Sequence, residues 1–124
     1  MPAIEVLLHR EADGTVPLLA WMTCIPPKAG DKLRVRIRRL RDLGYELRRP
    51  EADYLRDGIH ELRASLGGVQ YRILYFFHGR STAVLSHGLI KEALVPPREI
   101  DAAVDRRRSF RSNPGLRARM EETE

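Results

Sequence analysis

The chain has 124 residues, a length that suits one domain with one modest hydrophobic core and is too short for two. Its single cysteine excludes an internal disulfide, and its four scattered histidines form no zinc-like ligand cluster, so we expect neither a metal nor another cofactor. The first residues lack the pattern of a secretory signal, and no apolar run approaches the roughly 20 residues of a membrane span. We therefore expect a cytoplasmic protein with no membrane partner.

The formal net charge is +5, and the positive charge is concentrated in residues 28–49. Nine Lys and Arg residues stand there against three acidic residues, a formal charge of +6, while the rest of the chain is nearly balanced. A local cationic surface releases counterions when it binds a nucleic acid. The segment therefore favours a nucleic-acid partner, and a merely solvated basic helix is the open alternative.

The N-terminal third predicts a strand and two helices. Residues 4–9 are typical of a short strand, and the apolar residues at positions 18, 19, 21 and 22 predict a helix that Pro26-Pro27 ends. The next helix carries Leu33, Ile37 and Leu40 on one face and reaches a C-cap at Gly44.

From residue 58 the apolar pattern changes to a period of two. The runs 59–66, 69–78 and 81–89 are separated by Gly67-Gly68 and Gly79-Arg80, which suit two-residue turns and predict an antiparallel meander. Pro96-Pro97 opens a final helix, and the polar residues 113–124 predict a flexible tail. The prediction is an α+β fold, a compact single domain over residues 1–112. Its antiparallel sheet of about four strands packs with two N-terminal helices and one C-terminal helix.

Two-residue turns would fix the register of the sheet. Arg63 then faces Arg72, and Arg72 faces His87, whereas His60 falls on the opposite face as a packing residue. Like charges directly opposite one another destabilise a sheet by a few tenths to about 1 kcal/mol, so the row suggests an anionic ligand. Two guanidiniums suit a phosphate, and a histidine adds proton transfer. The structural alternative is that Glu61 forms ion pairs with the arginines.

Five further basic residues extend this candidate site. Lys91, just beyond the last run, would support the phosphate, and a solvated lysine is the ordinary alternative. Arg48 and Arg49, just before a proline, are candidates for guiding a nucleic-acid backbone, with a solvated loop as the open alternative, and Arg36 and Arg39 of the second helix are further candidates.

Four short segments keep a recognisable order and spacing. They are His60-Glu61-Leu62-Arg63, Gly68-Val69-Gln70-Tyr71-Arg72-Ile73-Leu74-Tyr75-Phe76, Ser86-His87-Gly88-Leu89-Ile90-Lys91-Glu92 and Pro97-Arg98-Glu99-Ile100. Together they resemble the phage-derived toxin-like family within the RelE/HigB group of type II toxin–antitoxin systems. The match is clearest over residues 43–110.

The resemblance implies ribosome-dependent cleavage of mRNA without a metal, and neutralisation by an antitoxin that is often a helix-turn-helix protein. In such toxins the 2′-hydroxyl attacks the adjacent phosphate, so Arg63, Arg72, His87 and Lys91 are the implied catalytic residues. RelE-type toxins often carry a tyrosine, histidine or lysine near the C-terminus, whereas the residues after Lys91 include arginines and Phe110 but no such side chain. The identity of the general base therefore stays open.

Other functions remain open at this stage. The wider superfamily includes ParE-like inhibitors of DNA gyrase, which need no phosphoryl-transfer site, and fold alone does not separate them from nucleases. A module that only binds nucleic acid or an antitoxin, and a relic without toxicity, are the further alternatives.

Overall fold

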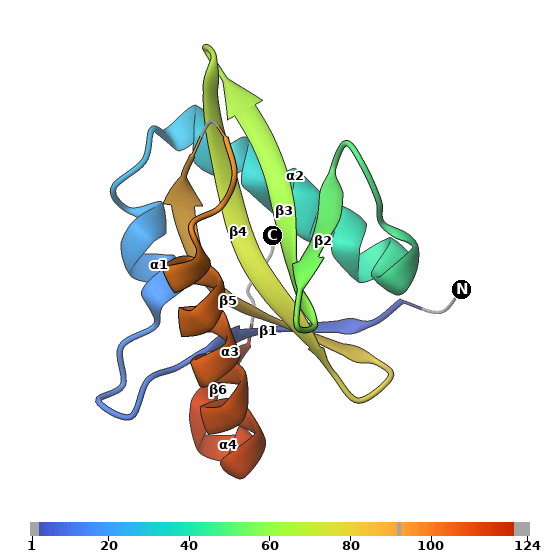
Figure 1. Ribbon diagram of the computed structural model, residues 1–124, viewed down its shortest axis with the longest axis vertical. Coiled ribbons are helices and arrows are strands. Elements are labelled where there is room, and N and C mark those ends of the chain that lie inside the picture. The colour runs from blue at the N-terminus through green and yellow to red at the C-terminus, as the bar shows by residue number, and fades with distance from the viewer. Residues whose placement is uncertain (1–2, 92, 121–124) are drawn as a thin grey trace.

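The computed structural model describes residues 3–91 and 93–120, which form a mixed α+β single domain, as predicted (Figure 1). The elements in chain order are β1 (Glu5–His9), α1 (Pro17–Met22), α2 (Pro27–Leu43), the 3-10 helix η1 (Gly44–Glu46), β2 (Ala52–Arg56), β3 (Ile59–Leu66), β4 (Val69–His78), β5 (Thr82–Ile90), α3 (Pro97–Ser112), α4 (Pro114–Arg117) and β6 (Ala118–Met120). The strands form one sheet in the order β2-β3-β4-β5-β1-β6.

The sheet departs from the prediction in two ways. It has six strands rather than about four, because the short strands β2 and β6 form its two edges. It is also mixed rather than antiparallel, because β1 pairs with β5 in parallel. Parallel partners are joined by long connections, so no turn signal in the sequence announces that pairing. The three predicted helices are present as α1, α2 and α3, and the short α4 is additional.

The two faces of the sheet are covered by different helices. In Figure 1, α2 lies behind the strands and α3 lies in front of them. Leu33 and Ile37 of α2 are buried in one cluster with Tyr75, which is an odd-numbered residue of β4. The even-numbered Phe76 belongs to a second cluster with Phe110 of α3. Burial of each such large apolar side chain contributes about 1.5–3 kcal/mol.

The turns decide which residues share a row of the sheet. Gly67 and Gly68 form the predicted two-residue turn, and both have the positive φ angles, 57° and 82°, that glycine adopts without steric cost. The register across this turn is confirmed, and Arg63 pairs with Arg72.

The register predicted across the second turn is wrong. Residues 79–81 form a three-residue loop, because the first pair after it is His78 with Thr82. A bulge then leaves Ser86 without a partner in the ladder, between the pairs of Tyr75 with Leu85 and of Leu74 with His87. His87 therefore keeps the predicted face but lies opposite Leu74, and Arg72 faces Leu89 instead.

Of the segment 113–124, which was predicted to be a flexible tail, Pro114–Arg117 form α4 and Ala118–Met120 pair antiparallel with β1. Residues 121–124 lie outside the described residues. No helix in the described part of the chain is both long enough and apolar enough to cross a membrane.

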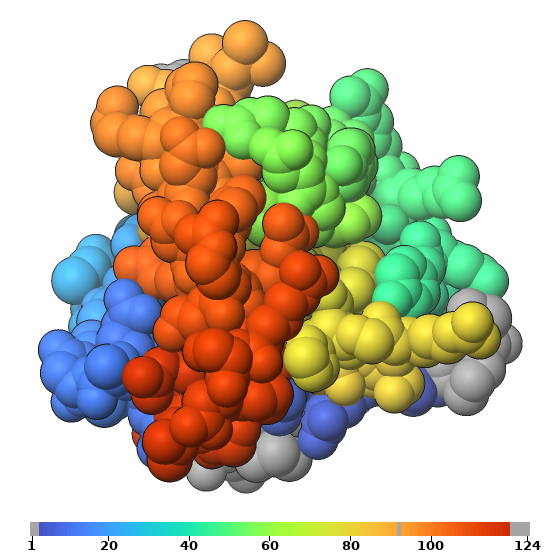
Figure 2. Space-filling model, turned by 60° about the horizontal axis from the view of Figure 1, so that its bottom comes forward, coloured from blue at the N-terminus to red at the C-terminus, as the bar shows by residue number. Residues whose placement is uncertain are grey.

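Helix α3 is fastened to the turn between β2 and β3. Figure 2 shows its orange surface against the green surface of that turn. Nη1 of Arg107 donates a 2.6 Å hydrogen bond to the carbonyl oxygen of Asp57, and Nη2 of Arg56 donates one of 3.0 Å to Oδ1 of Asp101. These contacts tie α3 to the β2 edge of the sheet.

Candidate functional site

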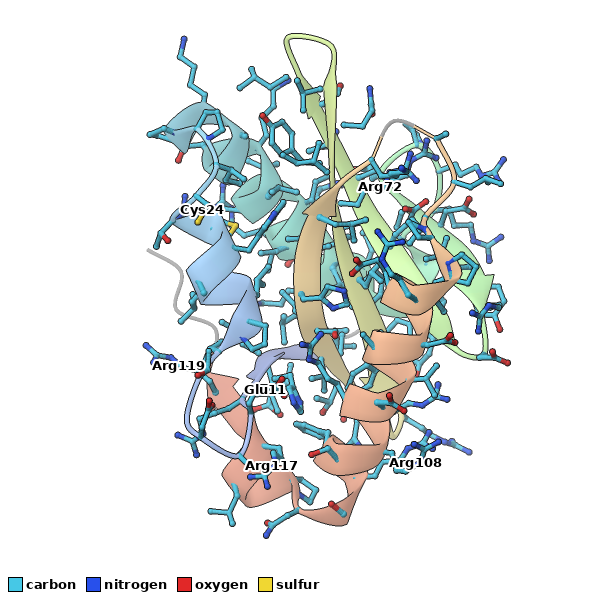
Figure 3. The ribbon with its side chains drawn as sticks, turned by 60° about the vertical axis from the view of Figure 1, so that its left-hand side comes forward. Glu11, Cys24, Arg72, Arg108, Arg117 and Arg119 are labelled. Atoms are coloured by element: carbon cyan, nitrogen blue, oxygen red, sulfur yellow. The ribbon has the colours of Figure 1, made fainter. Side chains whose placement is uncertain are left out.

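A cleft of about 480 Å³ lies at the β2 edge of the sheet, between β2, β3, β4 and the loop that joins β5 to α3. Its lining residues are Arg49, Asp53, Leu55, Glu61, Arg63, Arg72, Ala93, Leu94 and Val95. Figure 3 shows Arg72 beneath that loop. Three arginines that the sequence singled out thus share one cleft with two carboxylates.

Arg72 is the buried member of this group, with 6% of its surface exposed. Its Nη1 donates a 3.0 Å hydrogen bond to Oε1 of Glu61, which is itself buried. Its Nε is buried and has no hydrogen-bond partner among the described residues. The ion pair predicted as the structural alternative is therefore present, and it holds the guanidinium in place.

Arg63 is the accessible member. One third of its side chain is exposed, and its Nε lies 3.9 Å from Oε2 of Glu61, a much looser contact than that of Arg72. Its carbonyl oxygen accepts a 2.9 Å hydrogen bond from Nε of Arg36, which ties α2 to β3. Arg36 and Arg63 also line a smaller pocket of about 200 Å³ beside the cleft. The Arg63 guanidinium is therefore available to an anion.

The remaining predicted arginines lie around this edge of the sheet. Arg39 donates two hydrogen bonds to Glu51, of 2.9 and 3.0 Å, and Arg49 lies 2.8 Å from Oδ2 of Asp53. The hydrogen bond to Asp53 raises the pKa of Arg49, and the hydrogen bond to Glu51 raises the pKa of Arg39, so both stay charged. Arg48 lines a third pocket and, among the described residues, forms no ion pair or side-chain hydrogen bond.

Lys91 lies at the end of β5, just before the loop that lines the cleft, and its side chain is exposed. Its backbone nitrogen donates to the carbonyl oxygen of Gln70 at 3.1 Å. It is not one of the residues that line the cleft. Its neighbour Glu92, which belongs to the recognised Ser86–Glu92 segment, lies outside the described residues.

His87 lies beneath α3 rather than in the cleft. Its Nε2 is 2.9 Å from Oε1 of Glu99, and its Nδ1 is 2.9 Å from Nη1 of Arg106 and 2.8 Å from Oγ of Ser86. A guanidinium only donates, so Nδ1 accepts from Arg106 and the proton resides on Nε2, which donates to Glu99. Both ring nitrogens are thus used to hold the helix.

The charge state of His87 follows from these surroundings. Burial lowers the pKa of His87 below its ordinary value, and the positive charge of Arg106 lowers it further, while Glu99 acts in the opposite direction. The imidazole is therefore neutral at neutral pH, in agreement with the tautomer that the hydrogen bonds require.

The contacts of His87 continue to the end of β1. Nε and Nη2 of Arg106 each lie 3.3 Å from Oε2 of Glu11, and Oε1 of Glu11 is 2.8 Å from Nε2 of the buried His9. Figure 3 shows Glu11 well away from Arg72 along the sheet. This network therefore joins β1, β5 and α3, and it is separate from the arginine cleft.

Sequence reasoning missed this network, and one signal was present. Glu99 and Arg106 are seven residues apart, which places them on the same face of α3. The partners Glu11 and His9 come from the other end of the chain, so nothing local links them to the helix. Within the described residues, no three His, Cys, Asp or Glu side chains are grouped so that they could hold a metal ion.

The comparison with known protein families agrees with this picture. The family model "Phage derived protein Gp49-like (DUF891)" matches residues 20–108, which is more than half of the chain and includes every arginine of the cleft. No curated protein matches the chain. The chain therefore belongs to the phage-derived Gp49-like family, which is a toxin-like family of toxin–antitoxin systems.

Proposed function

We propose that the protein is the toxin of a type II toxin–antitoxin system and a metal-independent, ribosome-dependent mRNA endoribonuclease of the RelE/HigB type. The observation that carries the proposal is the cleft in which Arg63 and Arg72 lie on neighbouring strands, with Arg49 at its wall. Such a concave site with converging cations suits a phosphate group of a single RNA strand.

The proposed reaction is an internal transphosphorylation. The 2′-oxygen of the RNA forms a bond to the adjacent phosphorus as its proton leaves, and the bond from phosphorus to the 5′-oxygen breaks as that oxygen gains a proton. The products are a 2′,3′-cyclic phosphate and a 5′-hydroxyl end. Arg63 binds the phosphate directly, and Arg72, held by Glu61, adds positive charge that stabilises the charge developing on the phosphate.

Around the cleft, Arg36, Arg39, Arg48 and Arg49 would guide the RNA backbone, and Lys91 would support the phosphate from the end of β5. His87 was the predicted proton-transfer residue, but both of its ring nitrogens are occupied and it does not line the cleft. We therefore assign His87 a positioning role, because it holds α3 and with it the loop that roofs the cleft.

The ribosome would supply what the isolated cleft lacks. Positioning one mRNA phosphate against Arg63 converts a bimolecular step into an effectively unimolecular one, which can account for several kcal/mol of the barrier. An antitoxin, in this proposal a helix-turn-helix protein, would hold the toxin inactive until it is degraded.

The test is to map the 5′ ends of cellular mRNA after brief induction of the wild type, Arg63→Ala and Arg80→Ala. Arg80 is an exposed arginine of the β4–β5 loop, away from the cleft, and serves as the matched control. The proposal expects new ends within translated frames for the wild type and Arg80→Ala. It expects these ends to fall by about 100-fold or more for Arg63→Ala, because a donor to the developing charge is lost.

One observation favours a second function. The Arg72–Glu61 ion pair and the Arg49–Asp53 ion pair neutralise two of the three arginines of the cleft, as in a purely structural or binding surface. A ParE-like inhibitor of DNA gyrase needs only a binding surface and no phosphoryl-transfer site. Arrested growth with new DNA breaks and no new mRNA ends would select this alternative.

A further inference from the structure

The third pocket, which Arg48 lines, lies on the other side of the Arg49–Asp53 ion pair from the arginine cleft. It has a volume of about 480 Å³, and Tyr45, Arg48, Tyr54 and His60 are among its lining residues. Arg49 and Asp53 line both this pocket and the arginine cleft. An extended ligand that lies in the arginine cleft is therefore next to this pocket, across the edge of the sheet at β2.

The walls of this pocket are aromatic and accessible. Tyr45 is 46% exposed and Tyr54 is 55% exposed, so both rings are accessible from the solvent. Phe77 stacks on one face of Tyr45, with ring centroids 3.8 Å apart, and the hydroxyl of Tyr45 donates to the carbonyl oxygen of Gly79. The Tyr45 ring is thus held in place while part of its surface lines the pocket.

Two polar side chains of the pocket, those of His60 and Arg48, form no side-chain hydrogen bond or ion pair among the described residues. The ring of His60 lies parallel to Tyr75 and edge-on to Tyr54, but within residues 3–91 and 93–120 its nitrogens have no hydrogen-bond partner. Burial lowers the pKa of His60, so the imidazole is neutral and offers one donor and one acceptor. Arg48 stands beside it and, within the same residues, has no ion-pair partner.

We propose that this pocket binds a nucleobase of a single-stranded RNA against both of its exposed tyrosines, Tyr45 and Tyr54, next to the phosphate held in the arginine cleft. Flat aromatic platforms beside backbone-binding arginines are the chemistry that recognises unpaired bases, and a neutral imidazole suits the edge of a base. The inference rests on the proposed function, because the strand that supplies the base is the one whose phosphate lies in the cleft.

The test compares two probes that resist cleavage. One is a short single-stranded 2′-O-methyl oligoribonucleotide, and the other is an abasic oligonucleotide of the same length and charge. Binding is measured by fluorescence anisotropy on the purified wild type, Tyr54→Leu, Tyr54→Phe and Leu116→Ala. Leu116 is an exposed apolar residue of α4 far along the chain from the pocket, and thermal unfolding checks that each variant is folded.

The wild type should bind the base-bearing probe about fivefold or more tightly than the abasic one, since one stacked base contributes at least that factor. Tyr54→Leu should lose this preference while it keeps its affinity for the abasic probe. Tyr54→Phe, which keeps the ring, and Leu116→Ala should behave as the wild type does.

Three results would overturn the inference. They are equal affinity of the wild type for the two probes, an unchanged preference in folded Tyr54→Leu, and no binding of either probe. An unchanged preference would leave the pocket to another partner, such as a protein. None of these readouts depends on cleavage. If mRNA end mapping fails while the base preference is found, the nuclease proposal falls and the pocket assignment stands.

Discussion

Arg72 on β4 and Glu61 on β3 form a buried ion pair, with Nη1 of the arginine 3.0 Å from Oε1 of the glutamate. The two residues are not direct partners in the ladder, because Glu61 pairs with Leu74 and Arg72 pairs with Arg63. The contact is therefore a diagonal one across neighbouring strands, within reach of long side chains. It allows two arginines to stand side by side in the sheet.

Replacing Glu61 should destabilise the protein strongly. Glu61→Ala leaves a guanidinium buried without its counter-charge, and the free energy of unfolding should fall by about 3–5 kcal/mol. Urea unfolding measures this, with Asp53→Asn as the control, because the partner of Asp53 is the well-exposed Arg49. The double variant Glu61→Leu/Arg72→Leu should be more stable than Glu61→Ala. An unchanged urea midpoint in Glu61→Ala would contradict the role of the pair.

Stability should fall on mild acidification. Burial lowers the pKa of His87 below its ordinary value of 6.5, and burial does the same for His9 and His60. Below pH 6.5 the unfolded chain therefore binds more protons than the folded one. The contribution of the neutral histidines to the free energy of unfolding is complete above pH 6.5, and it is lost as the pH falls toward the pKa values of the folded state. The hydrogen bond from Arg39 keeps the pKa of Glu51 below 4.5, so its contribution is lost only at lower pH.

The measurement is the thermal midpoint of the wild type and His87→Gln between about pH 7.5 and about pH 5. The midpoint of the wild type should drop over this interval, and the drop should be smaller in His87→Gln, which has one titrating group fewer. Equal drops in the two proteins would show that His87 does not supply the effect.

Helix α3 should loosen when its anchor is removed. Arg106→Ala loses the hydrogen bonds to Glu11 and His87, and we expect a loss of about 1–3 kcal/mol. Hydrogen exchange should rise most in residues 97–112. The matched control is Arg108→Ala on the same helix, whose side chain is 76% exposed and contacts only Asp105 among the described residues. Equal exchange in both variants would argue against the anchor.

Gly88 should not tolerate a larger residue. A Cβ atom there would lie 2.0 Å from Cε3 of Trp21, so the Trp21 ring must move in Gly88→Ala, at a cost of about 1–3 kcal/mol. Gly115→Ala is the control, because no described atom lies within 4 Å of the position that its Cβ would occupy. Thermal unfolding of the two variants makes the comparison. A neutral Gly88→Ala would mean that Trp21 rotates away freely.

The candidate site was predictable where the signals are local. Arg63 and Arg72 face each other because a two-residue Gly67-Gly68 turn fixes the pairing of the strands on either side of it. The same alternation placed His60 on the face opposite to Arg72, where it packs on Tyr75.

The place of His87 was predicted only in part, because the bulge at Ser86 does not follow from the β5 sequence. In the folded protein Ser86 and His87 bind each other, and His87 is held by Glu99 and Arg106 of α3. The shift therefore depends on a helix that comes later in the chain, and no pattern within the strand contains it. The position of Tyr54 was not predicted either, because its strand β2 is too short and too polar to show a clear alternation of apolar residues.

The sequence by itself determined three helices, the three long strands, one turn and the face on which Arg63 and Arg72 lie, because spacing along one segment decides these features. Only the tertiary structure decided the parallel pairing of β1 with β5, the closer binding of Glu61 by Arg72 than by Arg63, and the burial of His87 beneath α3. Those features depend on which segments pack against one another, and the free energy of burying their apolar and charged side chains together exists only once the chain has folded.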